Sequence, residues 1–142
     1  MRYVIFSLLT SLLSITNIAF SETLITCENQ EGSQMSFSET SFSGKPLLNF
    51  TSTTTQINLS GDQIKIKKGF HPRSGMWVQG THGDNEFRQT ISFAVPPLNG
   101  PKNPQEPFEP FDTTVTVTTT DACCITGNTY EMNCIAHHFI AF

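Results

Sequence analysis

The chain has 142 residues, with 8 Lys or Arg and 12 Asp or Glu, so its formal net charge is −4 at pH 7. This length predicts a single compact domain. Aromatic residues make up 11% of the chain and charged residues only 14%, a composition that excludes an intrinsically disordered protein. A mildly acidic chain without a basic cluster is not expected to bind nucleic acid, because neutralising phosphates requires several clustered Lys or Arg side chains.

Residues 1–21 have the three-part layout of a secretory signal peptide. Arg2 supplies the positive charge, a mainly apolar stretch follows, and Ala19-Phe20-Ser21 places small residues at the −3 and −1 positions of a cleavage site. The apolar stretch contains several Ser and Thr residues and is shorter than the ~20 strongly apolar residues of a membrane span. We therefore expect cleavage after Ser21 and a mature domain of residues 22–142, periplasmic or secreted, without a membrane span.

Alternation of apolar and polar residues recurs along the mature chain and predicts half-buried strands. No window of helical length shows an apolar period of 3.6 residues. The fold class expected is therefore all-β, a small antiparallel sandwich or barrel of about seven or eight short strands. In chain order, the alternating segments are Leu24 to Glu28, Met35 to Phe37, Ile57 to Leu59, Gln63 to Lys68, Phe87 to Val95, Thr114 to Thr118 and Tyr130 to Ala136.

Turn-forming residues separate the predicted strands. Ser60-Gly61-Asp62 predicts a tight hairpin, and Thr126-Gly127-Asn128-Thr129 predicts another turn near the C-terminus. Residues 96–111 contain six prolines and predict a loop of polyproline-II character, because proline cannot donate to a strand ladder. This loop is either a stiff spacer or a binding loop that displays Phe108 and Phe111 on a pre-extended backbone.

The four cysteines, Cys27, Cys123, Cys124 and Cys134, all lie in the expected mature domain. An even count in an exported chain favours disulfides, and a zinc site formed with His137 or His138 is the less favoured alternative. A vicinal bridge between Cys123 and Cys124 is disfavoured as strained. The two remaining pairings both join Cys27 to a cysteine near the C-terminus and close a loop of roughly 100 residues.

Polar residues between Gly69 and Glu86 offer the candidate chemistry. Ser74, His82 and Asp84 could form a nucleophile, base and orienting carboxylate, although none of the common hydrolase motifs is present. Arg73 and Trp77 form a second candidate, since an exposed Trp beside an Arg can bind a sugar ring or a protein surface. Burial statistics favour Trp77 as a core residue.

The function expected is an exported, non-enzymatic binding or inhibitor module. Its partner is expected to be a protein or glycan outside the cytoplasm, and its candidate binding residues are Phe108, Phe111, Trp77 and Arg73. No cofactor and no metal ion are expected. The alternatives are a small hydrolase using Ser74, His82 and Asp84, and a structural component of the cell envelope.

Overall fold

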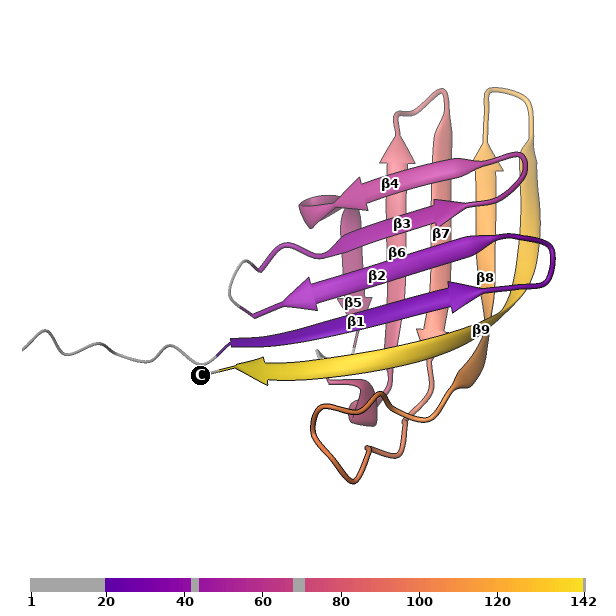
Figure 1. The fold of residues 1–142 in the computed structure, drawn as a ribbon. Helices are drawn as coiled ribbons and strands as arrows, with labels where there is room; N and C mark the ends of the chain where they lie inside the picture. The colour runs from indigo at the N-terminus through magenta and orange to yellow at the C-terminus, as the bar shows by residue number, and fades with distance from the viewer. Residues whose placement is uncertain (1–19, 42–43, 68–70, 142) are drawn as a thin grey trace, which may run out of the picture.

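The computed structural model describes residues 20–41, 44–67 and 71–141, which form nine antiparallel strands in one sheet (Figure 1). The all-β prediction is confirmed, with slightly more strands than expected. Most of the predicted signal peptide lies outside the described residues, which contain no helix long and apolar enough to cross a membrane. The strands are β1 (Phe20–Glu28), β2 (Gln34–Thr40), β3 (Leu47–Thr51), β4 (Gln56–Ser60), β5 (Ile64–Lys67), β6 (Met76–Gly83), β7 (Arg88–Val95), β8 (Phe111–Thr120) and β9 (Ile125–Ala141).

The sheet is a nearly closed barrel-like meander with the strand order β4-β3-β2-β1-β9-β8-β7-β6-β5. Strands β1 to β4 form one layer, and β5 to β8 cross behind them at a steep angle (Figure 1). The long strand β9 joins the layers: residues Ile125 to Cys134 pair with β8, and residues Asn133 to Ala141 pair with β1. The corner at which β9 changes partner is therefore at Asn133 and Cys134.

The core fills the space between the two layers with the inward-facing half of each strand. In β7, for example, Ile91, Phe93 and Val95 are buried, as their alternation with polar residues predicts. Gly80 in β6 faces Leu59 of β4 across the interior, where a Cβ atom would collide with the Leu59 side chain. Glycine at this position therefore lets the two edge regions of the sheet approach each other.

Two of the turn predictions are wrong, and one strand lies outside the segments predicted to be strands. Ser60-Gly61-Asp62 does not form a hairpin: a 3-10 turn, η1 (Gly61–Gln63), separates β4 from β5, and these strands lie at opposite ends of the sheet order. The predicted turn at residues 126–129 lies inside β9, and the connection between β8 and β9 is instead residues 121–124. Strand β6 occupies a segment whose glycines and polar residues resemble a loop.

The four cysteines form two disulfides, and no described cysteine is free. Cys27 and Cys134 face each other across β1 and β9, which confirms the long-range connection from Cys27 to a C-terminal cysteine. The second bond joins Cys123 to Cys124, so the prediction against a vicinal bridge is wrong. These two cysteines lie in a turn, so the opposite-face rule for neighbouring strand residues does not separate their sulfur atoms.

Candidate functional site

A groove of about 710 Å³ lies at the end of the molecule where the proline-rich loop passes the C-terminal part of β9. We call it the loop groove. Three segments far apart in the sequence meet there: the turn η2 (Pro72–Ser74), the loop before β8 and the end of β9 (Figure 1). Its lining residues are His71, Arg73, Pro101, Lys102, Pro104, Gln105, Phe108, His138, Phe139 and Ile140.

Local hydrogen bonds and packing hold the cationic side of the loop groove in place. The Nδ1 atom of His71 accepts the backbone N–H of Arg73 at 3.1 Å, and Pro72 between them is buried. The Arg73 guanidinium packs directly against Gly100, where an added Cβ atom would collide with it. The buried Phe108 donates its backbone N–H to the carbonyl of Ala136 at 2.8 Å and ties the loop to β9.

Two histidine rings lie side by side at the inner end of the groove. The centroids of the His71 and His138 rings are 4.2 Å apart, and His138 Nδ1 lies 2.9 Å from the Thr23 hydroxyl oxygen. Burial lowers the pKa of His71, and the neighbouring Arg73 charge lowers it further. The pKa of His138 is lowered by burial and then by His71 and Arg73. Both rings are therefore neutral at pH 7.

Among the described residues that line the loop groove, Arg73 and Lys102 are basic and none is acidic. The closest interior acid by strand register is Glu39, whose partner Thr23 on β1 also pairs with His138. Burial raises the pKa of Glu39, and one of its carboxylate oxygens has no hydrogen-bond partner. The groove thus combines a guanidinium that can hold an oxyanion through two parallel hydrogen bonds with the apolar surfaces of Phe108, Phe139 and Ile140.

The predicted binding residues separate into two groups. Arg73 and Phe108 both line the loop groove. Phe108 and Phe111 are only 4% and 7% exposed, so the loop does not display them, and Phe111 is the first residue of β8. Trp77 is half-buried on the outer face of β6, with the Lys67 ammonium 5.1 Å from its ring centroid, so its assignment to the core is wrong.

The predicted hydrolase triad does not assemble. Ser74 precedes β6 and His82 lies near the far end of that strand, which separates them by roughly 25 Å at the rise of an extended chain. The Asp84 carboxylate accepts the backbone N–H groups of Glu86 and Phe87, at 2.8 and 2.9 Å. These hydrogen bonds lower the pKa of Asp84 and use this carboxylate to close the turn between β6 and β7.

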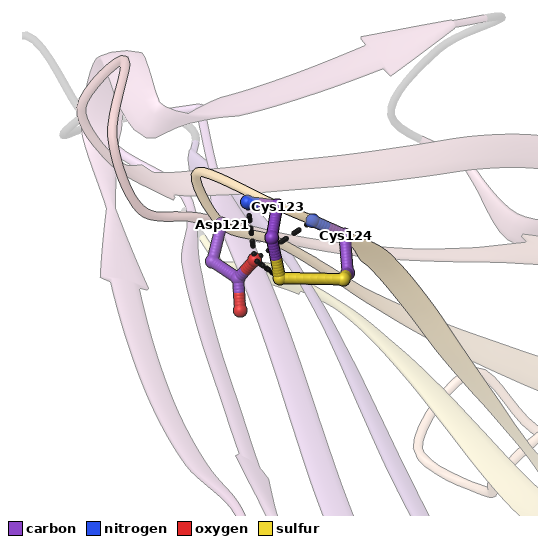
Figure 2. Close-up of side chains that lie close together, drawn as sticks. All are labelled: Asp121, Cys123 and Cys124. Atoms are coloured by element: carbon purple, nitrogen blue, oxygen red, sulfur yellow. Dashed lines mark hydrogen bonds between the residues drawn. A yellow bond between two sulfur atoms is a disulfide. The ribbon is translucent and has the colours of Figure 1, made fainter.

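Among the described residues, one group brings three potential metal ligands together. The ligand atoms of Asp121, Cys123 and Cys124 lie within 4.8 Å of one another at the tip of the β8–β9 hairpin (Figure 2). The two sulfur atoms are bonded to each other, and a disulfide sulfur is not the thiolate that binds zinc. Cys27 and Cys134 are held in the other disulfide, so no described cysteine offers a thiolate to join His137 or His138 in the zinc alternative.

Sequence reasoning named His138 only as an alternative zinc ligand and did not place His71 and His138 in one site, where the structure brings their rings together. The two histidines are 67 positions apart, and neither lies in a metal-binding or catalytic motif. His71 lies directly before η2, and the bend of β9 brings His138 to it. The chain matches no known protein family, no curated protein and no solved structure.

Proposed function

We propose that this protein is an exported, non-enzymatic binding module that captures an acidic group of a partner protein in the loop groove. The observation that carries the proposal is the meeting of Arg73, Lys102 and two neutral histidines beside apolar surface, with no acidic side chain among the described lining residues. A free C-terminal carboxylate next to an apolar side chain matches this chemistry. Its carboxylate would accept hydrogen bonds from Arg73, and its side chain would pack on Phe139 and Ile140.

The loop groove favours an anionic ligand over a neutral one for an electrostatic reason. The chain carries a net negative charge, so a local pair of cations attracts an acidic group only at short range. Partial burial strengthens that attraction because the groove walls exclude part of the solvent. The proline-rich wall is stiff, so little conformational entropy is lost when a ligand orders it.

Ligand class is tested with a small acid and its neutral analogue. The imidazole resonances of the purified, oxidised protein are followed by NMR during titration with N-acetyl-leucine and, separately, with its amide. We expect N-acetyl-leucine to shift the His71 and His138 resonances and the amide to have a much smaller effect. Equal shifts with both compounds, or no shift with either, would contradict the proposal.

Two variants locate the site. Arg73→Gln removes the guanidinium and is expected to weaken binding of the acid about tenfold or more, the usual loss for a charged hydrogen bond. Gly100→Ala places a methyl group where the guanidinium now lies and should weaken binding without unfolding the domain, because the Arg73 side chain can move aside. The matched control is Arg88→Gln, which removes an equal charge from an exposed position of β7 and should leave binding unchanged.

Export is tested independently of binding. The protein is recovered from the extracytoplasmic fraction of cells that express the full chain, and its first residues are determined. The proposal predicts that the chain begins at Glu22. A protein that remains in the cytoplasm with Met1 to Ser21 attached would contradict export.

A further inference from the structure

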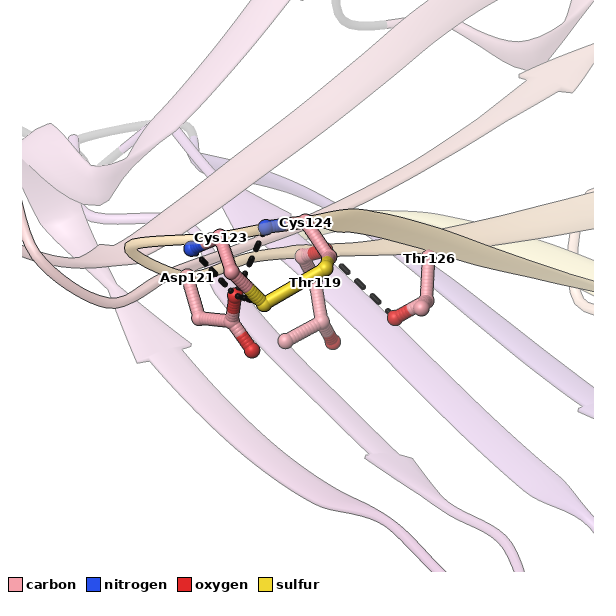
Figure 3. The surroundings of a disulfide bond; sticks show 5 residues. All are labelled: Thr119, Asp121, Cys123, Cys124 and Thr126. Atoms are coloured by element: carbon pink, nitrogen blue, oxygen red, sulfur yellow. Dashed lines mark hydrogen bonds between the residues drawn. A yellow bond between two sulfur atoms is a disulfide. The ribbon is translucent and has the colours of Figure 1, made fainter.

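The tip of the β8–β9 hairpin carries a disulfide in an unusual setting. Cys123 and Cys124 are adjacent in the sequence, and both are exposed to solvent. Figure 3 shows the sulfur bridge lying along the turn, with Asp121 on one side and the pair Thr119 and Thr126 on the other. No core residue covers this bridge, so a dissolved thiol can reach its sulfur atoms directly.

We propose that the Cys123–Cys124 bond is a thiol–disulfide exchange site, which an external dithiol opens while the domain stays folded. One thiolate of the dithiol attacks a sulfur of the bridge, which forms a mixed disulfide and releases the other cysteine as a thiolate. The second thiolate of the reagent then displaces the protein sulfur. The products are a reduced Cys123–Cys124 pair and the oxidised, disulfide-bonded reagent, so two electrons and two protons pass to the protein.

The turn is held by hydrogen bonds that do not depend on the sulfur bridge. The Asp121 carboxylate oxygen Oδ1 accepts the backbone N–H groups of Cys123 and Cys124 at 3.0 and 2.9 Å. The backbone N–H of Asp121 donates to the carbonyl of Cys124 at 3.0 Å. One strand pair further on, the Thr126 hydroxyl donates to the Thr119 carbonyl at 3.5 Å. Reduction therefore leaves the two thiols side by side, ready to re-form the bridge.

The second disulfide is protected from the same reagent. Cys27 is 4% exposed and Cys134 is fully buried, so a thiol reaches their bond only after β1 separates from β9. Cys124 and Cys134 are ten positions apart along the chain, which corresponds to roughly 33 Å of extended chain. Thiols released at the tip therefore cannot attack the buried bond within the same molecule.

Asp121 also affects the rate of exchange. Its Oδ1 atom lies 3.2 Å from the Cys123 sulfur, so its negative charge repels the attacking thiolate. For an exposed pair of charges in water this repulsion slows the reaction by about two- to fivefold. Replacing Asp121 with Asn keeps an oxygen acceptor for the turn and removes the charge. The structure therefore assigns Asp121 two roles: it holds the turn closed and slows exchange.

The experiment uses the full oxidised chain and dithiothreitol as the dithiol. Samples are quenched with acid at intervals, alkylated, and cleaved at Glu131, which separates Cys123 and Cys124 from Cys134. We expect label on Cys123 and Cys124 at least about tenfold sooner than on Cys27 and Cys134, with an unchanged circular dichroism spectrum. Removing the dithiol in air should restore the bridge. Simultaneous labelling of all four cysteines, or loss of β structure with the first label, would overturn the proposal.

Two variants complete the test. Asp121→Asn should react about two- to fivefold faster than the native chain at low salt, and the difference should shrink at high salt because ions screen the carboxylate. The double variant Cys123→Ser with Cys124→Ser should lose the fast labelling phase and keep the slow one. A fast phase that persists in the double variant would assign exchange to Cys27–Cys134 and overturn the proposal.

Discussion

The two disulfides of this protein are the same chemical bond in opposite surroundings. The Cys27–Cys134 bond lies buried at the corner where β9 leaves β8 for β1, and it joins residues 107 positions apart. The Cys123–Cys124 bond lies exposed at a hairpin tip and joins neighbours (Figures 2 and 3). The first therefore restricts the unfolded chain strongly, and the second restricts it very little.

This difference separates stability from reactivity. A bond that closes a long loop stabilises the folded state mainly by removing conformations from the unfolded chain, whether or not a reagent can reach it. A bond at an exposed tip reacts readily and contributes little to that entropy. The corner and the tip of one hairpin thus have separate roles, one structural and one chemical.

Removing the corner disulfide is expected to have the largest effect. Replacing Cys27 and Cys134 by Ala should lower the free energy of unfolding by about 4–5 kcal/mol, because the bond closes a loop of more than 100 residues. Urea unfolding followed by circular dichroism measures the loss. Replacing Cys123 and Cys124 in the same way should cost about 1 kcal/mol or less. Equal losses of unfolding free energy in the two variants would contradict the expected difference between the two disulfides.

A smaller effect is expected where the proline-rich loop is anchored beside the corner. Phe108→Ala removes a buried ring and should lower the free energy of unfolding by about 3 kcal/mol. Ile125→Ala, at the first residue of β9 beyond the tip, removes a side chain that is 73% exposed and should change it by less than about 0.5 kcal/mol. A Phe108→Ala variant as stable as the native chain would show that the loop is not anchored by this ring.

The smallest expected change in stability comes from the protonation of His71 and His138 as the pH falls. The folded-state pKa values of His71 and His138 lie below 6.5, so the unfolded chain binds more protons as the pH falls below that value. The free energy of unfolding is therefore expected to decrease progressively as the pH falls from neutral through the folded-state pKa values. A bound anion favours the protonated rings, so binding of N-acetyl-leucine should instead tighten over the same range.

Arg73 acts on the pKa of both histidines, Lys102 lines the same groove, and Glu39 is aligned with His138 through Thr23 in the strand register. Glu39 has a raised pKa, so the folded chain binds this proton more readily than the unfolded chain does. Protonation of Glu39 therefore increases the free energy of unfolding as the pH falls, whereas protonation of the histidines decreases it. The variant Glu39→Gln removes that contribution and should make the loss of stability at low pH steeper. A flat stability profile below pH 6.5 in this variant would contradict the lowered histidine pKa values.

Strands with strict alternation were predictable because burial of one face leaves a period of two in the sequence. The inward-facing Ile91 and Phe93 and the buried Ile64 follow this rule. Strand β6 does not, because Gly80 replaces an inward side chain so that Leu59 can pack against it. The hairpin predicted at Gly61 failed for a related reason: a turn signal marks a change of direction and does not specify which strands then pair.

The candidate site was only partly predictable. Arg73 was predicted as a binding residue beside Trp77, and Phe108 as one on the proline-rich loop; the structure places both in the lining of the loop groove. His71 and His138 meet only through the curvature of β9, a property of the whole sheet that no short segment encodes. The cysteine pairing depended on whether Cys123 and Cys124 lie in a strand or a turn, and Asp121 decides this by accepting both of their backbone N–H groups.

The most direct test of this account is a disulfide map of the unreduced protein. Cleavage at Glu28 and Glu131 places Cys27, Cys134 and the Cys123–Cys124 pair on separate peptides. The account predicts that the peptide of Cys27 is joined to that of Cys134, and that the peptide with Cys123 and Cys124 is unattached and lighter by two hydrogens than its reduced form. A covalent link from Cys27 to the peptide of Cys123 and Cys124 would contradict it.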